Sequence, residues 1–247
     1  MRYLILSDIH ANLTALDAVL AAAKGHWDKV ICLGDVVGYG PDPNEVVDRI
    51  REIGALTIRG NHDKAGSGIA NADDFNPVAR AVALWTRDQL RPENREWLEQ
   101  LPTGPLNENG FVMVHGAFRD EDEYVFAPAQ ALDSLLDAHA QITFFGHTHL
   151  QGGFTLRDDQ VAVLHFKPAA GQPFAALAVD DGTTYLLNPG SIGQPRDGDT
   201  RAAFVIADLP KKSIEFWRVP YDIEAVQKRM GAGGLPEPLI QRLAFGR

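Results

Sequence analysis

The stretch MRYLILSDIHANL, residues 1–13, contains an apolar run that ends abruptly in polar residues. Tyr3 to Leu6 are typical of a buried strand, and Ser7, Asp8 and His10 follow them closely. Asp and Ser at the end of a strand commonly form a turn, in which their side chains accept hydrogen bonds from nearby backbone N–H groups. This stretch alone favours a turn, so the rest of the chain decides whether Asp8 and His10 have a chemical role.

Length and composition indicate an ordinary globular protein. The chain has 247 residues, enough for one large α/β domain or two small ones, and 45% of them are hydrophobic. No stretch approaches the roughly 18 consecutive apolar residues of a membrane-spanning helix, and the N-terminus lacks the pattern of a signal peptide. Cys32 is the single cysteine, which fits a reducing compartment. We therefore expect a cytoplasmic protein without a membrane segment, in which Cys32 is buried and unreactive.

The charge of the chain limits its partners. The formal net charge is −10, and an acidic surface opposes tight, nonspecific binding to a nucleic-acid backbone. A small phosphorylated substrate held by a few local cations is compatible with this charge, and the oligomeric state is left open. Residues 120–123, DEDE, are expected to form a solvated loop or to repel polyanionic substrates. Arg59, next to the segment Gly60-Asn61-His62-Asp63, could reach phosphate or pair with an acidic residue, and pairing is the expected role.

The first part of the chain alternates predicted strands with predicted helices. The strands are expected at residues 3–7, 28–33 and 55–58, and the helices at residues 12–24 and 44–53. A βαβαβ order implies a parallel sheet with helices on its faces. Residues 71–101 are predicted to form a helical insertion, in which Trp85 and Trp97 serve packing.

Two further buried strands, at residues 111–114 and 142–145, enclose a predicted helix at 128–138. After Gly152 the pattern changes to short β-rich segments separated by turns, which predicts a mostly antiparallel second sheet. These segments are residues 161–166, 174–179, 183–187, 202–206 and 214–219. A helical tail is expected from about residue 221 to residue 247. The predicted fold is α/β: a four-layer αββα sandwich of two mixed β-sheets flanked by helices, in one domain over residues 1–247.

Polar residues follow five of the predicted strands. They are Asp8 and His10, Gly34-Asp35, Gly60-Asn61-His62-Asp63, His115-Gly116, and Gly146-His147-Thr148-His149. Ligands of α/β sheets bind at the carboxyl ends of the strands, so chain direction gathers these residues along one rim. One such residue would be an ordinary cap or turn residue, but five coincidences favour a metal site.

Seven of these residues offer carboxylate oxygens, an amide oxygen or imidazole nitrogens. They are Asp8, His10, Asp35, Asn61, His115, His147 and His149. Seven ligands are too many for one tetrahedral ion and suit two ions that share a bridging carboxylate, for which Asp35 is the natural candidate. Mixed nitrogen and oxygen ligands suit two divalent transition-metal ions, among Mn, Fe, Zn, Co and Ni, and Mn is our first expectation.

The same residues closely resemble the motifs of the calcineurin-like metallophosphoesterase superfamily, whose pattern is D-x-H, G-D, G-N-H-[DE], H and G-H-x-H. Here the pattern reads SDIH, LGD, RGNHD, VHG and GHTH, from residue 1 to about residue 150. The sandwich fold of that family would account for the β-rich remainder. The later segment NPGSIGQPRDGD is similar to the small bacterial and archaeal phosphodiesterase branch of the superfamily.

The resemblance implies a role for each matched residue. It assigns one ion to Asp8, His10, Asp35 and His149, and the other to Asp35, Asn61, His115 and His147. His62 would donate a proton or a hydrogen bond to the phosphate or the leaving oxygen, and Asp63 would orient His62. The two ions would make hydroxide available near neutral pH, and the hydroxide would attack phosphorus in line.

Three residues outside the metal motifs are expected to contact substrate. Arg196 can clamp phosphate oxygens with its guanidinium group, and Ser191 lies in a Gly-Ser turn that can present backbone N–H groups to phosphate. Asn12 could line the pocket together with Tyr39, although turn packing explains both residues equally well.

From these expectations we predict an enzyme that uses two metal ions to hydrolyse phosphate esters. Phosphodiesters of small cyclic nucleotides or dinucleotides are the leading substrates. A phosphomonoesterase or phosphoprotein phosphatase is the enzymatic alternative, because the same metal centre serves both. A metal-binding scaffold and a nucleotide-binding regulator are the non-enzymatic alternatives. Loss of His62 or of a ligand would have favoured the scaffold, and none is lost. Slow release of a bound nucleotide without product would identify the regulator.

Overall fold

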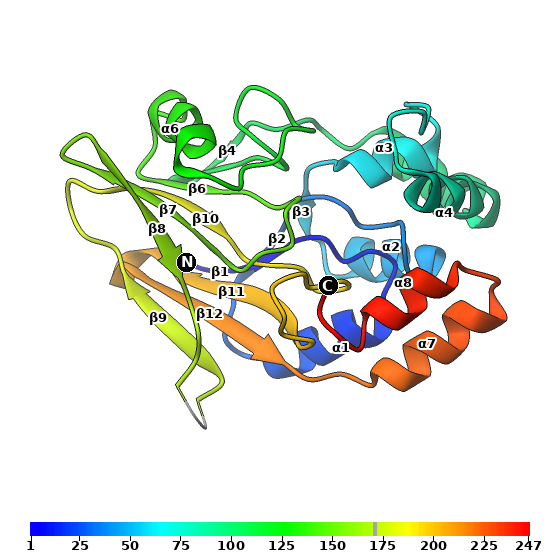
Figure 1. Ribbon diagram of the computed structural model, residues 1–247. Coiled ribbons are helices and arrows are strands. Elements are labelled where there is room, and N and C mark those ends of the chain that lie inside the picture. Colours follow the sequence, from blue (N-terminus) through cyan, green and yellow to red (C-terminus); the bar gives the residue numbers. More distant parts are fainter. Residues whose placement is uncertain (170–171) are drawn as a thin grey trace.

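Two six-stranded β-sheets lie face to face in the middle of the protein, with helices on their outer faces (Figure 1). The computed structural model describes residues 1–169 and 172–247. Apolar side chains of both sheets fill the space between them, among them Tyr3, Ile5, Phe144 and Phe216. The predicted αββα sandwich is therefore confirmed.

The first sheet has the strand order β3-β2-β1-β11-β12-β9. β1 (Arg2–Leu6), β2 (Lys29–Cys32) and β3 (Leu56–Thr57) are parallel, and α1 (Leu13–Ala22) and α2 (Pro43–Glu52) connect them as the βαβαβ pattern predicted. β11 (Ala202–Asp208) pairs antiparallel with β1 and places Ile206 opposite Leu4. β12 (Ser213–Val219) and β9 (Phe174–Ala178) extend the sheet. α1 covers its outer face, where Leu16 packs in the same cluster as Leu4.

The second sheet has the strand order β4-β5-β6-β10-β7-β8. Its strands are β4 (Leu106–Glu108), β5 (Phe111–Met113), β6 (Ile142–Phe144), β10 (Thr184–Asn188), β7 (Gly152–Arg157) and β8 (Gln160–His165). β5, β6 and β10 run parallel, and the other strands are antiparallel to their neighbours. α6 (Pro128–Asp137) covers the outer face of this sheet through Ala131 and Leu135.

The β-rich C-terminal half does not form a sheet of its own, which corrects the prediction of a mostly antiparallel second sheet. β9, β11 and β12 join the first sheet, whereas β7, β8 and β10 join the second, so both sheets are mixed. The physical reason is that β1 and β6 are almost entirely buried. A buried strand needs a hydrogen-bonded neighbour along each edge, and β11 and β10 supply those neighbours.

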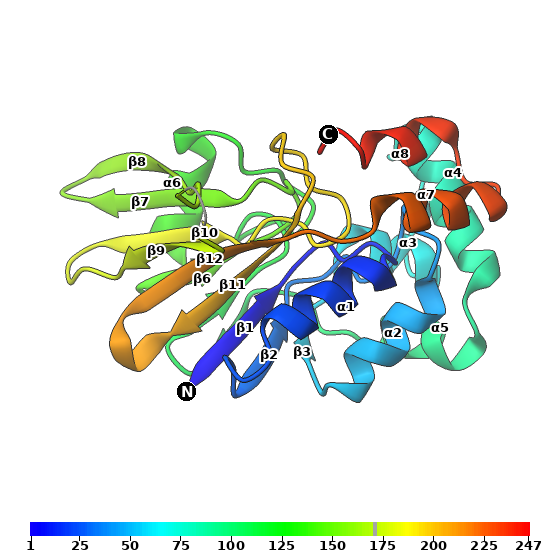
Figure 2. The ribbon, with the colours of Figure 1, turned by 90° about the horizontal axis from the view of Figure 1, so that it is seen from below.

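The remaining α-helices gather at the end of the sandwich toward which β1 and β2 run (Figure 2). α3 (Asn61–Ser67) precedes the predicted insertion, which contains α4 (Pro77–Gln89) and α5 (Pro92–Glu99). α7 (Ile223–Ala232) and α8 (Glu237–Arg242) form the predicted tail and pack on α4 through Val82, Met230 and Leu239. The short helix η1 (Leu209–Lys211) links β11 to β12. Trp85 and Trp97 pack against apolar clusters, as expected.

Among the helices in the described ranges, none is both long and apolar enough to cross a lipid bilayer. The assignment of residues 1–247 to one domain stays a prediction.

Candidate metal centre

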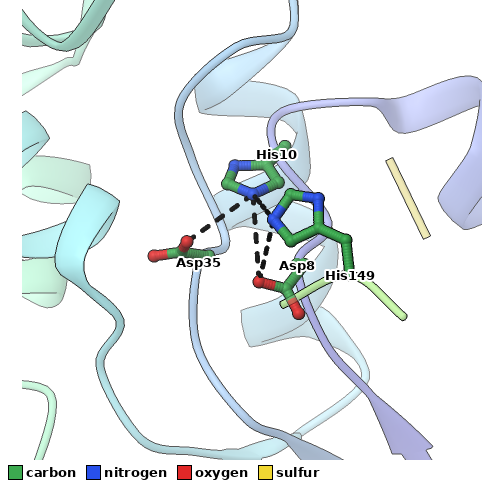
Figure 3. A group of neighbouring side chains, drawn as sticks. All are labelled: Asp8, His10, Asp35 and His149. Carbon is green, nitrogen blue, oxygen red and sulfur yellow. Dashed lines mark hydrogen bonds and ion pairs between the residues drawn. The ribbon is translucent and has the colours of Figure 1, made fainter. Parts of the chain in front are cut away.

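The ends of β1, β2, β5 and β6 bring two groups of buried acidic and imidazole side chains together. The first group consists of Asp8, His10, Asp35 and His149, and the second of Asp35, His115 and His147. Within each group, one potential ligand atom of every residue lies within 4.8 Å of those of the others. Figure 3 shows the two carboxylates and two imidazoles of the first group facing one another. Both groups contain Asp35, which fits its predicted bridging position.

Most of these residues lie in tight turns with a left-handed backbone. The angle φ is 51° at Asp8, 48° at His10, 53° at Asp35, 65° at His147 and 60° at His149. This conformation costs about 1–3 kcal/mol at a non-glycine residue and persists only where the surrounding structure imposes it. The turns after β1, β2 and β6 therefore bend the chain so that the side chains converge on the centre.

Backbone carbonyls orient three of the imidazoles. Nδ1 of each ring lies against a carbonyl oxygen, at 3.0 Å for His10 and Val37, 2.8 Å for His115 and Leu33, and 2.6 Å for His149 and Gln194. A carbonyl oxygen only accepts hydrogen bonds, so Nδ1 carries a proton in each ring and Nε2 faces the cluster. Metal-ligating histidines are commonly oriented in this way.

The Nε2 atoms of His10 and His149 lie only 3.0 Å apart. Burial lowers the pKa of both rings, so both are neutral and each Nε2 presents a lone pair. Two facing lone pairs repel unless a cation lies near both. Nε2 of His149 is also 3.3 Å from Oδ1 of Asp8. This set of imidazole nitrogens and carboxylate oxygens fits a divalent transition-metal ion.

Asn61, the predicted amide ligand, lies beside the second group. Nε2 of His115 lies 3.3 Å from Oδ1 of Asn61 and 3.5 Å from Oδ2 of Asp35. Asn61 is the first residue of α3, so the helix that begins after β3 carries the amide to the centre. The structure thus brings all seven predicted ligand residues together.

The buried charges of the centre act on one another. Burial opposes ionisation of Asp35, but His115 and His62 hold its pKa well below the ordinary value. Burial likewise opposes protonation of His115, but Asp35 raises its pKa to about 10. Without metal, an ionised Asp35 therefore faces a protonated His115 at neutral pH, and a metal ion must displace that proton to bind Nε2.

His147 is oriented by a loop rather than by a strand. Its Nε2 lies 3.1 Å from the carbonyl oxygen of Asp122. Burial lowers the pKa of His147 to about 3, so the ring is neutral, Nε2 carries the proton and Nδ1 keeps the lone pair. The ring of Tyr124 stacks on His147 with the ring centroids 3.8 Å apart. The strand-end motifs contain neither Asp122 nor Tyr124, because neither residue follows a strand end.

Asp120, Asp122 and Glu123 are exposed, as expected of a solvated acidic loop, but an ion-pair network through Glu121 and Asp122 fixes the loop against α3. Glu121 accepts hydrogen bonds from Arg59 and Lys64, both at 2.9 Å, and Asp122 accepts from Lys64 at 2.7 Å. The side chain of Lys64 is 10% exposed. The two cations neutralise the acids, which allows the loop to lie over the site, and Arg59 pairs with an acid as predicted.

His62 lies beside both groups. Its ring centroid is 5.0 Å from that of His10, 4.3 Å from that of Tyr39 and 4.8 Å from that of Phe75. Burial lowers the pKa of His62 to about 4, so the ring is neutral at pH 7. Among the described residues, Nδ1 of His62 is buried without a hydrogen-bond partner. Aromatic packing therefore positions the ring.

The structure gives Asp63 a different role from the predicted one. Oδ1 of Asp63 accepts from the backbone N–H of Val37 at 3.1 Å, and Oδ2 accepts from that of Gly60 at 3.0 Å. Both oxygens thus bond to backbone and tie the turn after β2 to the start of α3, rather than holding the His62 ring. Burial, reinforced by the charge of Asp35, raises the pKa of Asp63 to about 7.

A cavity of about 370 Å³ opens beside the second group. Three predicted site residues line it: Asn61, His62 and His147. Aromatic walls are formed by Tyr39, Phe75 and Tyr124, and polar walls include Lys64, Asn71, Asp74 and Asp122. The cavity therefore joins the centre to a space large enough for an organic group.

Comparison with known proteins identifies the family. Residues 1–212 match the calcineurin-like phosphoesterase superfamily domain. The chain belongs to that superfamily. It is 35% identical over 248 residues to protein MJ0912 of Methanocaldococcus jannaschii, and the alignment covers 98% of this chain and 97% of that one.

Solved structures agree with this membership of the calcineurin-like phosphoesterase superfamily. A metallophosphoesterase from Sphaerobacter thermophilus is 42% identical with a TM-score of 0.86, and the match covers 100% of this chain and 99% of that chain. The protein PH1004 from Pyrococcus horikoshii OT3 shares the fold, with 20% identity, a TM-score of 0.79 and coverage of 100% and 98%. Membership and the two buried clusters together identify a metal-dependent phosphoesterase.

Two predicted substrate residues of this phosphoesterase serve the fold instead. Oδ1 of Asn12 caps α1 by accepting from the N–H of Ala15, and Nδ2 donates to the carbonyl of Gly193, both at 3.1 Å. Oγ of Ser191 donates to the carbonyl of Asp8 at 2.7 Å. Both side chains are almost fully buried and lie outside the walls of the cavity. They position the turn after β1, because their polar atoms are engaged with backbone.

Arg196, the third predicted substrate residue, borders the centre. Its backbone N–H donates to the carbonyl of His149 at 3.2 Å. Its guanidinium carbon lies 5.7 Å from the ring centroid of Tyr39, which is itself a wall of the cavity. Arg196 is therefore the one of the three whose position suits a contact with phosphate.

Proposed function

We propose that the protein hydrolyses phosphodiesters of small, nucleotide-like substrates with the help of two divalent ions. The observation that carries the proposal is the cavity of about 370 Å³, which is lined by Asn61, His62 and His147 and walled by aromatic rings. A phosphodiester has an organic group on each side of the phosphate, so its hydrolysis needs space beyond the metal centre. Flat aromatic walls such as Phe75 and Tyr124 suit a nucleobase, because rings stack favourably.

The residues that would hold the ions follow from the two groups. Asp8, His10, Asp35 and His149 would hold one ion, and Asp35, Asn61, His115 and His147 the other. The chemistry supplied by such a pair, when bound, is hydroxide near neutral pH and neutralisation of phosphate charge. Mn²⁺ is our first choice, since the ligands are imidazoles, carboxylates and an amide.

His62 would act on the substrate from the wall of the cavity. Its pKa of about 4 keeps the ring neutral at pH 7, so in the metal-free protein it is suited to donate a hydrogen bond rather than to carry a positive charge. A hydrogen bond to a phosphate oxygen or to the leaving oxygen strengthens as negative charge develops there. Arg196 would contact phosphate from the side of Tyr39.

The deciding experiment compares two substrates after metal has been removed and Mn²⁺ restored. Faster metal-dependent hydrolysis of bis-p-nitrophenyl phosphate than of p-nitrophenyl phosphate is the expected result. The opposite preference would replace the proposal with a phosphomonoesterase or phosphoprotein phosphatase. Metal binding without cleavage of either compound would favour the scaffold or the nucleotide-binding regulator.

A variant pair controls for metal dependence. Asp35→Asn should weaken binding of both ions and abolish hydrolysis, because Asp35 belongs to both groups. Asp28→Asn changes an aspartate near the surface that pairs with Arg2, and it should leave metal content and hydrolysis unchanged. Loss of only one ion in Asp35→Asn would contradict the bridging role.

A further inference from the structure

Two arginines from distant parts of the chain meet beside the metal centre. Nη2 of Arg196 and Nη1 of Arg242 each donate to Oε1 of Gln194, both at 3.1 Å. Gln194 is 1% exposed, so a buried amide fixes both guanidinium groups from inside the fold. Arg242 is the last residue of α8, in the tail that follows the matched residues 1–212.

No carboxylate of the described residues neutralises this arginine pair. By contrast, Arg201, Arg218 and Arg229 each form an ion pair with an aspartate. In the same described ranges, Nε of Arg196 and Nε2 of Gln194 are buried and lack a hydrogen-bond partner. Two neighbouring guanidinium groups repel each other, and buried N–H donors without an acceptor are unfavourable. An anion that lies against the pair would relieve both costs.

The position of the pair connects it to the reaction. Arg196 is bonded through its backbone to His149, and its guanidinium lies against Tyr39. The ring of Tyr39 is 4.7 Å from that of His10, centroid to centroid. The arginine pair therefore borders the first metal group, whereas the acidic residues of the cavity, Asp74 and Asp122, lie beside the second group.

The energetics of Arg242 agree with this placement. Burial and the neighbouring charge of Arg196 both lower the pKa of Arg242. An arginine stays protonated in spite of such a shift, so the repulsion persists in the protein without ligand. A bound anion would relieve it.

We propose that Arg196 and Arg242 form an anion subsite that binds phosphate oxygens of the substrate. Guanidinium groups bind phosphate with paired N–H donors, and two of them suit a group with several charged oxygens. The inference rests on the proposed phosphoesterase function and adds to it a substrate-binding residue contributed by the helical tail.

Binding of inorganic phosphate to the Mn²⁺-loaded protein, measured by calorimetry, tests the subsite directly. Arg242→Gln should weaken binding by about 10–100-fold, as expected for the loss of a hydrogen bond between charged groups. Arg242→Lys should have a smaller effect, because it keeps the charge but not the forked donors. Arg247→Gln is the matched control, since Arg247 is an exposed arginine of the same tail, and it should bind phosphate normally.

Kinetics with two substrates show which phosphate occupies the subsite. Bis-p-nitrophenyl phosphate has one phosphate, whereas diadenosine tetraphosphate has four. A higher KM for both substrates in Arg242→Gln means that the pair holds the phosphate under attack. A higher KM for the tetraphosphate alone means that it holds a neighbouring phosphate. Both results support the subsite, and a metal content and melting temperature equal to those of the natural protein separate them from general damage to the enzyme.

Equal phosphate affinity and equal KM in Arg242→Gln and Arg247→Gln would overturn the inference. If Arg242→Gln lowers the melting temperature, Arg242→Lys, which keeps a positive charge at this position, separates loss of charge from loss of stability. If the natural protein binds phosphate but cleaves no ester, the proposed function fails, while calorimetry on the same variants still decides the subsite.

Discussion

The backbone of Gly60 passes so close to Asp35 that a Cβ atom at position 60 would lie 2.2 Å from Oδ1 of Asp35. The same atom would lie 2.7 Å from Cε1 of His115. Glycine is therefore required here by the close approach of the turn before α3 to the shared carboxylate. The motif G-N-H-D therefore supplies the proposed ligand Asn61, and its glycine leaves the space that the Asp35 carboxylate occupies.

Gly60→Ala should consequently damage both metal groups at once. The methyl group would push Asp35 from its position, and we expect the affinity for each ion to fall by about 10–100-fold, as for other changes that disturb ligand orientation. Metal content after dialysis is the measurement. Gly231→Ala is the control, because the nearest atom to its Cβ, on Ile240, is 4.0 Å away. Full metal content in Gly60→Ala would contradict the steric account.

Metal binding should stabilise the fold, since the facing Nε2 atoms of His10 and His149 are unfavourable without a cation. With free metal at a hundred times Kd, each occupied site should raise the free energy of unfolding by about 2.7 kcal/mol. For a chain of this size that is an increase of about 5–10 °C in Tm. Thermal unfolding with Mn²⁺ and with a chelator measures it, and identical transitions would refute a folded-state metal site.

Binding of metal should also release protons. The pKa of His115 is raised to about 10 in the metal-free protein, so its Nε2 is protonated at pH 7 and must lose that proton to a metal ion. Affinity for metal should therefore rise between pH 6 and pH 9, by about tenfold per pH unit for one displaced proton. Calorimetry in buffers with different ionisation enthalpies counts the protons, and a count of zero would show that His115 is already neutral.

His62→Ala should separate catalysis from metal binding. Both ions should remain, because the two groups do not include His62, whereas kcat should fall by about 10²–10⁴-fold with the loss of its donor. His165→Ala, at an exposed position of β8, is the matched control and should leave kcat unchanged. Normal turnover in His62→Ala would remove His62 from the mechanism.

Glu121→Gln should lower stability in a way that depends on pH. Burial opposes ionisation of Glu121, but hydrogen bonds from Arg59 and Lys64 lower its pKa to about 2. The folded-state pKa is thus below the ordinary value of 4.5, so its contribution is present above pH 4.5 and is lost as the pH falls toward 2. We expect Glu121→Gln to lower the free energy of unfolding by only about 1 kcal/mol at pH 7, because solvent screens this partly exposed network.

Urea unfolding at pH 7, 5 and 3 tests the effect of Glu121→Gln. The difference from the natural protein should shrink as the pH falls. Glu52→Gln, which breaks an exposed pair with Arg49, should have little effect at any pH. An equal loss of stability at pH 7 and pH 3 would indicate that Glu121 acts through packing rather than through its charge.

The residues of the two buried Asp/His clusters could be predicted because they obey local rules. Asp8, Asp35 and His115 follow apolar strands directly, and parallel strands that run the same way must end at the same rim. The roles of Asn12, Ser191 and Asp63 could not be predicted from such rules. Each bonds to backbone of a different segment, Gly193, Asp8 and Val37 respectively, and sequence spacing does not show which backbone group lies within reach.

The sequence by itself determined the layered α/β fold, the residues of the two buried Asp/His clusters and the superfamily, because strand hydrophobicity and strand-end motifs are properties of short segments. Only the tertiary structure decided how the C-terminal strands divide between two sheets, why an acidic loop lies over His147, and that Arg242 reaches Gln194 from α8. These outcomes depend on contacts between segments far apart in the chain. Such contacts form only where packing places opposite charges, or a donor and an acceptor, within about 3 Å of each other.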